Sequence, residues 1–302
     1  MAHDELEFVD WLRGRQSSHR DVLLGIGDDM ARIRVSSPSF LLSSDMLLDG
    51  VHFVSGQHSW EQIGRKAVAC SLSDCAAMAV RPLGAVVSLA LPSAMSLADV
   101  QRLMQGMFAI AADFEMAIAG GDTARWDAPL AIDVAITARP FEGIEPVTRS
   151  GAVVGDGLFV TGPLGGSILG RHLDFNPRVQ EAFFLASACG ERLHAMIDVT
   201  DGLSLDLWRM CRASGVGAEL DESLLLAVAS DDAKTLSQRD GRPVFDHVVG
   251  DGEDFELLLA AGGPGEIAGV NVLPVGRVTG SGLTIRRRDG RTEPLTPRGY
   301  LH

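Results

Sequence analysis

The feature of this sequence that most constrains its fold is an acidic turn that recurs after strand-like apolar stretches in both halves of the chain. The stretch FLLSSDML, residues 40–47, predicts a buried strand that ends in two hydroxyl groups and the carboxylate of Asp45. The stretch MIDVTDGL, residues 196–203, repeats this order with Asp198 and Asp201. Strands that alternate with helical patterns predict a protein of mixed α and β structure.

The composition limits the partners that this chain can have. Of its 302 residues, 26 are Lys or Arg and 40 are Asp or Glu, which gives a formal net charge of -14. Nucleic acids and anionic membranes attract basic surfaces, so we expect neither as a partner. A phosphate compound can still bind, because metal ions can offset the repulsion between its charges and these carboxylates.

The sequence also predicts the compartment. Its longest apolar stretch, residues 75–92, is interrupted by Arg81 and Pro82, so it does not predict a membrane span. The first fifteen residues are charged and amphipathic, unlike a signal peptide. None of the four cysteines forms a C-x-x-C pair, so we expect a cytoplasmic protein with free thiols.

Helical spacing, apolar runs and glycine-rich stretches predict the order of the elements. Residues 139–157 are rich in Pro and Gly and mark the entry into a second domain, so we expect domains at 1–139 and 140–302. The expected helices are 4–15, 59–80, 97–114 and 178–189, the expected strands 40–47, 84–92, 116–120, 130–138, 158–162, 252–261 and 272–280, and the expected turns 120–125 and 163–166.

The helix expected over residues 59–80 carries a carboxylate on an otherwise apolar stripe. Ser59 and Gln62 have the spacing of a capping box at its start. Asp74 follows Ala67 by seven residues, so the two lie on one face of the helix. An unpaired charge among buried side chains is unfavourable, so Asp74 indicates a functional position.

Acidic turns offer oxygen ligands at six places along the chain. Carboxylate and hydroxyl oxygens suit Mg2+, a hard cation that keeps several waters and uses few protein carboxylates. Several ions that share one phosphate cluster would explain the whole set. The positions are Asp28-Asp29, Ser43-Ser44-Asp45, Asp74, Gly121-Asp122-Thr123, Asp198-Val199-Thr200-Asp201 and Gly252-Glu253-Asp254.

Single members of this set also have structural interpretations. Asp is common in turns and at helix N-termini, because its side chain satisfies nearby N–H groups. Asp29 could therefore cap a short helix, and Asp201 could cap the helix that follows it. Asp254 could lie on a solvated face.

Three other residues have structural interpretations, and two of them also have functional ones. His52 could be a core histidine that donates to a carbonyl, or a ligand contact. Arg149 could be a surface residue, or a fork that binds phosphate. Lys66 could simply pair with an acid on its own helix.

Common catalytic motifs are absent from the sequence. It has no G-x-x-x-x-G-K-[ST] loop, no V-A-I-K lysine, no H-E-x-x-H and no G-x-S-x-G. The acidic turns do not follow the ligand order of an EF-hand. A standard P-loop enzyme, a protein kinase, a zinc protease and a serine hydrolase are therefore excluded.

Several segments, in order along the chain, resemble the thiamine-monophosphate kinase family of the PurM-like (aminoimidazole ribonucleotide synthetase-like) superfamily. The combination of GGDT, LSDCAAM and GEDFEL is specific to this family within the superfamily. The matching segments, between residues 25 and 256, are GIGDDMA, SSDMLLDGVHF, GRKAVACSLSDCAAMAVRP, GGDTAR, TRSGAVVGDG, MIDVTDGLSLDL and GDGEDFEL.

The resemblance implies a fold and an activity. The fold would be α+β, with an N-terminal α/β domain whose sheet pairs with its twin in a homodimer and a C-terminal α+β domain. The activity would be phosphorylation of thiamine monophosphate to thiamine diphosphate, with ATP as co-substrate. Direct in-line transfer assisted by several Mg2+ ions is implied, and no nucleophilic or basic side chain is assigned.

The resemblance also assigns residues to the site. His52 and Glu253 would contact the thiamine substrate, and Gly121, Asp122, Arg149 and Thr200 would contact ATP. The family often has an aromatic residue three positions before a late tyrosine. Pro297 stands at that position here, and Tyr300 is the only tyrosine of the chain. The implied Mg2+ ligands are Asp29, Ser43, Ser44, Asp45, Asp74, Asp122, Asp198 and Asp201.

The sequence is also compatible with two other functions. The chain could be another PurM-like ATP-dependent enzyme, although a selenophosphate synthetase would need a cysteine before Cys70. It could also be a non-catalytic homologue that binds nucleotide or metal. The intact set of aspartates argues against the second alternative, because a sensor need not keep every metal ligand.

Overall fold

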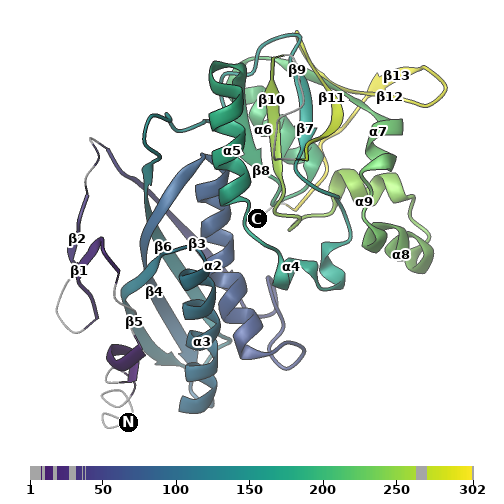
Figure 1. Ribbon diagram of the computed structural model, residues 1–302. Coiled ribbons are helices and arrows are strands. Elements are labelled where there is room, and N and C mark those ends of the chain that lie inside the picture. Colours follow the sequence, from purple (N-terminus) through teal and green to yellow (C-terminus); the bar gives the residue numbers. More distant parts are fainter. Residues whose placement is uncertain are drawn as a thin grey trace. The chain divides into compact units, whose positions relative to one another are not determined.

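A computed structural model shows two compact units, each with its own sheet (Figure 1). Unit 1 comprises Met1–Cys75 and Arg81–Pro140, and unit 2 comprises Ala76–Val80 and Phe141–His302. Both units combine helices with strands, which confirms the α+β fold class. The structure describes residues 8, 11–15, 19–26, 32–35, 37, 39–262 and 271–300.

Unit 1 is built on a four-stranded sheet with the order β3-β6-β4-β5. β3 and β6 are antiparallel, and β4 and β5 are parallel. The expected helix over residues 4–15 lies partly outside the described residues, and residues 11–15 are helical. The elements are β1 (Val22–Leu24), β2 (Arg32–Ile33), β3 (Leu41–Leu48), α2 (Trp60–Ala77), β4 (Val80–Pro92), α3 (Leu97–Asp113), β5 (Ala117–Trp126) and β6 (Ala131–Pro140).

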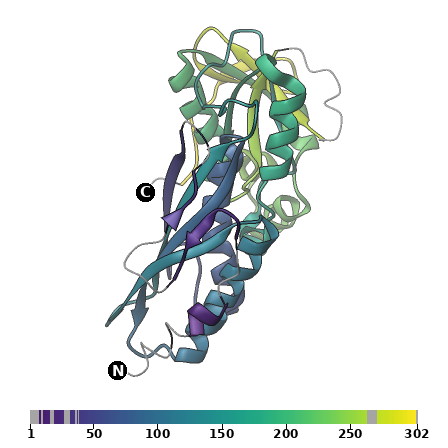
Figure 2. The same cartoon turned by 60° about the vertical axis from the view of Figure 1, so that its left-hand side comes forward.

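Helices α2 and α3 cover one face of this sheet (Figures 1 and 2). Along β6, Ile132, Val134 and Ile136 are buried and the residues between them are half-buried, because successive side chains of a strand point to opposite faces. On β3, the face away from the helices carries the exposed side chains of Leu42 and Met46.

Two glycines allow α2 and α3 to pack against each other at short range. A Cβ atom at Gly64 of α2 would lie 2.0 Å from the carbonyl oxygen of Leu103 in α3. A Cβ atom at Gly106 of α3 would likewise lie 2.0 Å from the carbonyl oxygen of Glu61 in α2. The backbones of the two helices are therefore in direct contact at both positions.

The capping box predicted at the start of α2 is confirmed. The Ser59 N–H donates to Gln62 Oε1 at 3.2 Å, and the Gln62 N–H donates to Ser59 Oγ at 3.2 Å. These bonds satisfy two of the backbone donors that a helix start leaves unpaired. Further along α2, Asp74 is half-buried and Ser71 is fully buried, as the helical spacing predicts.

Two predictions for unit 1 are wrong. Residues 120–125, expected as a turn, lie inside β5, because this strand continues in parallel register beside β4. Gly121 permits the close pairing, since a Cβ atom there would lie 1.9 Å from the carbonyl oxygen of Val87. Asp45 lies inside β3 rather than at its end, because the pairing with β6 continues to Leu48.

Unit 2 is built on a seven-stranded sheet with the order β13-β12-β9-β11-β7-β10-β8. Its neighbouring strands are antiparallel, except for the parallel pair of β9 and β12. β10 is buried along its whole length between β7 and β8. The strands are β7 (Gly157–Val160), β8 (Leu193–Asp198), β9 (Gly217–Asp221), β10 (Leu257–Ala261), β11 (Leu273–Thr279), β12 (Leu283–Arg286) and β13 (Thr292–Pro294).

The helices of unit 2 pack around this sheet, and side chains such as Leu207 of α6 join Val160 and Leu258 of the sheet in one apolar core. The predicted helix over residues 178–189 is confirmed as α5. The helical elements are η1 (Ser167–Leu169), α4 (Arg171–Asp174), α5 (Val179–Cys189), η2 (Gly190–Arg192), α6 (Leu203–Ser214), α7 (Glu222–Ala227), α8 (Asp231–Asp240) and α9 (Val244–Gly250).

One prediction for unit 2 is wrong in its boundary. The strand expected over residues 252–261 begins only at Leu257. The backbone before it cannot be a strand, because Glu253 and Phe255 have φ angles of 60 and 52 degrees. Among the described residues of the whole chain, no helix combines the length and the apolar character needed to cross a bilayer.

Candidate functional site

A pair of carboxylates lies between β3 and α2 in unit 1. Asp45 of β3 accepts a hydrogen bond from Ser71 Oγ of α2 at 2.8 Å, and Asp74 lies on the same helix. The pKa of Asp45 is raised to about 6, mainly by burial and then by the charge of Asp74, while the Ser71 hydrogen bond opposes the rise. The two negative charges repel each other, the burial of Asp45 weakens the screening by solvent, and a cation would relieve that repulsion.

The same negative field acts on the neighbouring thiol. The pKa of Cys75 is raised by burial and by the charges of Asp74 and Asp45. A raised pKa keeps the thiol neutral, and a neutral thiol is a poor nucleophile. Cys75 is therefore a buried, neutral thiol.

β3 places its two serines on opposite faces of the sheet. Ser43 shares the face of Asp45, because residues two apart on a strand point the same way. Ser44 points to the other face, where its hydroxyl donates to Asp133 Oδ1 at 2.6 Å. The structure therefore brings Ser43 together with Asp45, and Ser44 could reach the same ion only through its backbone oxygen.

Asp122 also lies on the face away from the helices. In the parallel register of β4 and β5, Asp122 is opposite the exposed Ser88, whereas Val87 and Leu89 are buried on the helix side. Asp122 is itself exposed. Within one protomer, the sheet thus separates the carboxylate of Asp122 from that of Asp45.

His52 lies in the loop between β3 and α2, and its main chain is held by a buried lysine. Lys66 of α2 has no exposed surface, and its Nζ donates to the carbonyl oxygen of His52 at 2.5 Å. The Leu48 N–H donates to His52 Nδ1 at 3.0 Å, so the neutral ring carries its proton on Nε2. The ring nitrogen that a substrate would meet is therefore a donor.

The acidic turn of unit 2 follows β8, as the sequence predicts. The predicted order of strand, acidic turn and helix is confirmed by β8, residues 199–202 and α6. Asp198 and Asp201 are both buried to more than nine-tenths. The suggestion that Asp201 caps α6 is wrong, because the residue before the helix is Gly202 and no side chain caps it.

Asp206 and Arg209 of α6 hold this turn, and the sequence analysis did not single them out. Asp206 Oδ2 accepts the N–H groups of Thr200, Asp201 and Gly202 at 3.0, 3.0 and 3.2 Å. Arg209 Nη1 lies 2.7 Å from Asp206 Oδ1 and 2.5 Å from Asp201 Oδ2. The pKa of Asp206 is raised to about 6 by burial, against the backbone hydrogen bonds. In the sequence, Asp206 and Arg209 are three positions apart, which puts them on one helix face. This spacing is the sequence signal that could have pointed to them.

The structure brings Glu253 beside the acidic turn. The Glu253 N–H donates to the carbonyl oxygen of Thr200 at 2.6 Å, and the Phe255 N–H donates to that of Val199 at 2.9 Å. Leu257 is the register partner of Asp198 in the sheet. The loop that carries Glu253 and the turn that carries Thr200 are therefore joined by main-chain hydrogen bonds.

Two further segments of unit 2 lie next to this turn. The Tyr300 N–H donates to the carbonyl oxygen of Asp201 at 2.9 Å, and the side chain of Tyr300 is half exposed. The Met196 N–H donates to the carbonyl oxygen of Thr148 at 3.0 Å, which places the exposed Arg149 beside β8.

The solvated position that the sequence allowed for Asp254 is wrong, because its relative exposure is 1%.

The donors present fit a hard cation that keeps part of its water shell. Within the described ranges, no group of three or more His, Cys, Asp or Glu residues could hold a metal ion on its own. The structure instead offers the carboxylate pair of Asp45 and Asp74 in unit 1, and the separate buried carboxylates of Asp198 and Asp201 in unit 2. Mg2+ is commonly bound by one or two carboxylates. Asp29 lies outside the described residues, so its assignment stays a prediction.

Comparisons with known proteins show which family this chain belongs to. Residues 27–139 match the model of the AIR synthase related protein, N-terminal domain, and residues 153–259 match that of its C-terminal domain. A thiamine-monophosphate kinase from Rhodopirellula baltica is 42% identical over 99% of this chain and 97% of its own. The chain belongs to the thiamine-monophosphate kinase family. The resemblance drawn from the sequence motifs is thereby confirmed.

Other members of the thiamine-monophosphate kinase family agree in sequence and in structure. The protein from Escherichia coli K12 is 31% identical over 95% of this chain and 94% of its own. The crystal structure of the enzyme from Stenotrophomonas maltophilia has a TM-score of 0.78 at 29% identity and covers 93% of this chain and 95% of its own. The structure of AaThiL complexed with AMPPCP and TMP has a TM-score of 0.76 at 26% identity and covers 92% of this chain and 91% of its own.

Proposed function

We propose that this protein transfers the γ-phosphoryl group of ATP to thiamine monophosphate and releases ADP and thiamine diphosphate. Family membership over nearly the whole chain and the relative solved with AMPPCP and TMP support this reaction. On this chain, the observation that most supports the reaction is the 2.6 Å hydrogen bond from the Glu253 N–H to the carbonyl oxygen of Thr200. That bond joins a residue assigned to the acceptor to one assigned to ATP.

The roles of the side chains in this proposal are those that the family resemblance implies. His52 and Glu253 contact the thiamine substrate, and Gly121, Asp122, Arg149 and Thr200 contact ATP. Mg2+ is held by carboxylate and serine oxygens, and when bound it supplies the positive charge that offsets the repulsion between the phosphate groups. The proposed ligands are Asp29, Ser43, Ser44, Asp45, Asp74, Asp122, Asp198 and Asp201.

The reaction needs no basic side chain. A phosphate monoester has a second pKa of about 6, so at neutral pH the acceptor already presents an ionised oxygen. What the protein must do is hold two phosphate groups so that the attacking and leaving oxygens are in line. The rigid acidic turn, fixed by Asp206 and Arg209, is suited to that task.

The sheet of unit 1 supports a homodimer. Leu42 and Met46 of β3 are 68% and 60% exposed on the face away from α2 and α3, and Val86 of β4 is 41% exposed. An apolar sheet face of this kind is typical of an interface with another molecule. We propose that it pairs with the same face of a second copy, which also places Asp122 at that interface.

Two coarser expectations belong to the same proposal. The break between the compact units at Pro140 and Phe141 supports the domain division at 1–139 and 140–302. Cys70, Cys75, Cys189 and Cys211 are all thiols rather than disulfides, which supports a reducing compartment such as the cytoplasm.

A panel of acceptors tests the function against its alternatives. Purified full-length protein is incubated with ATP, Mg2+ and thiamine monophosphate, thiamine or an aminoimidazole ribonucleotide-type substrate, and ADP is measured. We expect ADP to form faster with thiamine monophosphate than with either of the other two acceptors. Turnover only with the aminoimidazole type would indicate another PurM-like enzyme, and no turnover would indicate a non-catalytic homologue.

A further inference from the structure

The loop before β10 has a backbone that ordinary residues avoid. Glu253 and Phe255 are both in the left-handed region, with φ angles of 60 and 52 degrees. This conformation is unfavourable for a residue that has a Cβ atom, and it persists only where the surroundings hold it. Phe255 is held by stacking on Phe175, with ring centroids 3.8 Å apart and planes 8° apart.

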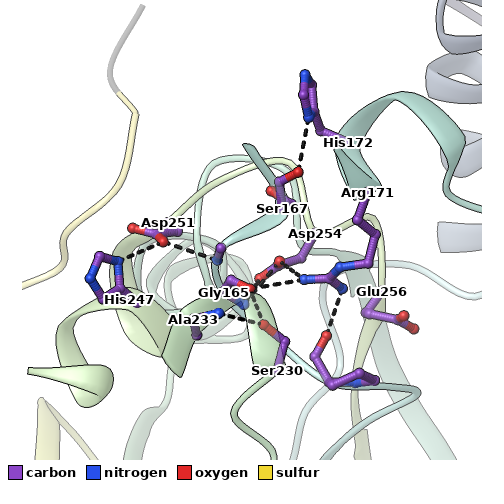
Figure 3. Close-up of polar contacts among 12 residues, drawn as sticks. Gly165, Ser167, Arg171, His172, Ser230, Ala233, His247, Asp251, Asp254 and Glu256 are labelled. Atoms are coloured by element: carbon purple, nitrogen blue, oxygen red, sulfur yellow. Dashed lines mark hydrogen bonds and ion pairs between the residues drawn. The ribbon is translucent and has the colours of Figure 1, made fainter. Parts of the chain in front are cut away.

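Three polar links hold the residues on both sides of Glu253, and Figure 3 shows those made by Asp251 and Asp254. Before it, Asp251 Oδ2 accepts the Gly166 N–H at 3.0 Å. After it, the two oxygens of Asp254 accept the Gly165 N–H at 2.9 and 2.8 Å.

The third link comes from the next residue of the same turn. Ser167 Oγ donates to the carbonyl oxygen of Gly252 at 2.7 Å. Residues 165, 166 and 167 thus each bond to the loop, and none of the three links goes through Glu253.

The turn that supplies these donors is itself fixed. Gly165 and Gly166 have φ angles of 85 and 74 degrees, and a Cβ atom at Gly166 would lie 2.4 Å from the backbone nitrogen of Ala233. The carbonyl oxygen of Gly165 accepts hydrogen bonds from Ser230 Oγ and from Arg171 Nη2. The N–H groups of this glycine-rich turn therefore serve protein carboxylates rather than a phosphate.

Each anchoring carboxylate has its own partner. The side chain of Asp254 has no exposed surface, and Arg171 Nη2 lies 2.8 Å from its Oδ1. His247 is buried, and its Nδ1 lies 2.9 Å from Asp251 Oδ2. Both anchors are thus held from a second side (Figure 3).

We propose that Asp251 and Asp254 are positioning residues that, through the turn of residues 165–167, set the place of Glu253 against the acceptor substrate. The inference rests on the proposed function, in which Glu253 contacts thiamine monophosphate. Loss of an anchor would let the strained loop relax and move the Glu253 carboxylate. Binding of the acceptor would weaken, whereas binding of ATP would not, because Asp206 holds Thr200 independently of the loop.

The test compares KM values for the two substrates in four variants of the full-length protein. Asp254→Asn keeps the shape of the side chain and removes its charge, and Ser167→Ala removes the third link. We expect KM for thiamine monophosphate to rise about tenfold in Asp254→Asn and about threefold in Ser167→Ala, because small misplacements of binding groups are costly. KM for ATP should stay within about twofold of wild type in both.

Glu256→Gln is the matched control. Glu256 is also buried and bound to an arginine, with Arg178 Nη2 and Nε at 2.7 and 2.9 Å, but it has no link to the turn of residues 165–167. We expect both of its KM values to match wild type. An equal rise of KM for both substrates in Asp254→Asn, or the same rise in Glu256→Gln, would indicate general loosening and overturn the proposal.

Two further outcomes separate this inference from the proposed function. Glu253→Gln should raise KM for thiamine monophosphate about tenfold. A wild-type KM in that variant would refute the assignment of Glu253 to the acceptor. A raised KM in Glu253→Gln with wild-type KM values in Asp254→Asn and Ser167→Ala would leave the assignment in place and refute the positioning role. If Asp254→Asn does not fold, the KM values of Ser167→Ala alone decide whether the positioning role holds.

Discussion

Asp254 is a carboxylate with no exposed surface whose charge is balanced by Arg171. Its pKa is raised to about 7, mainly by burial, while Arg171 and the Gly165 N–H oppose the rise. The pKa of an unfolded Asp is about 3.9, so between about pH 4 and 7 the folded protein keeps a proton that the unfolded chain has lost. The stability that this group contributes therefore falls as pH rises through that window.

Asp254→Asn removes this titration. We expect the free energy of unfolding of wild type, relative to the variant, to fall by about 2 kcal/mol between pH 5 and pH 8. Urea denaturation of both proteins at several pH values measures it. Parallel pH profiles for the two proteins would show that Asp254 does not titrate in this range.

Asp45 is a largely buried carboxylate next to a second negative charge, that of Asp74. We expect Asp45→Asn to fold and to lose activity by at least about 10²-fold, because one proposed metal ligand is gone. Mg2+ should raise the Tm of wild type by about 3 °C or more, and that of the variant by less.

The control for Asp45→Asn removes a charge elsewhere in the same unit. Asp113 is exposed at the end of α3, and Asp113→Asn should keep both the activity and the response to Mg2+. An Asp45→Asn protein with wild-type turnover would contradict the metal assignment.

The candidate side chains of unit 1 and unit 2 were predictable to different degrees. Asp74 could be found because a charge on an apolar helical stripe needs a reason. The support of Asp201 by Asp206 and Arg209 could not be predicted, because an acidic and a basic residue three positions apart are also common on an ordinary exposed helix. What distinguishes them is burial and three backbone N–H groups, which depend on the path of the chain.

At the scale of elements, the contact between α2 and α3 leaves no room for a side chain at Gly64 or Gly106. Gly64→Ala would place a methyl group 2.0 Å from the carbonyl oxygen of Leu103, so the helices must separate. We expect a loss of about 2 kcal/mol in the free energy of unfolding, measured by urea denaturation. Gly280→Ala, where the added Cβ meets nothing within 4 Å, should change it by less than about 0.5 kcal/mol. Equal stability of Gly64→Ala and wild type would contradict the packing described.

Elements with local signals were predictable, and those set by their neighbours were not. The box of Ser59 and Gln62 fixed the start of α2 from the sequence alone. The GGDTAR segment reads as a turn because glycine is rare in strands, yet β4 extends far enough to pair with it. The strained backbone at Glu253 had no sequence signal, since glutamate normally avoids positive φ.

At the scale of the whole molecule, the two faces of the unit 1 sheet carry different parts of the proposed site. Asp45 points to the helix side, and Asp122 points to the exposed apolar face that we propose forms the dimer. A sheet cannot present both carboxylates to one ion within one protomer. In the proposed dimer, Asp122 of one protomer therefore serves the site of its partner.

Mixing two inactive variants tests this sharing. We expect Asp45→Asn and Asp122→Asn homodimers each to be inactive. Mixed dimers, formed by co-expression, then contain one site with both carboxylates intact. A statistical mixture is half mixed dimers with one good site each, so about one quarter of wild-type activity should return. No recovery in verified mixed dimers would place both side chains in the same protomer's site.

The transfer of the phosphoryl group itself tests the central claim most directly. ATP labelled with 18O in its γ-phosphoryl group is incubated with the full-length protein, Mg2+ and thiamine monophosphate, and the products are analysed by mass spectrometry. The account predicts one labelled terminal phosphoryl group on thiamine diphosphate for each ADP formed. Labelled inorganic phosphate together with unchanged thiamine monophosphate would contradict it.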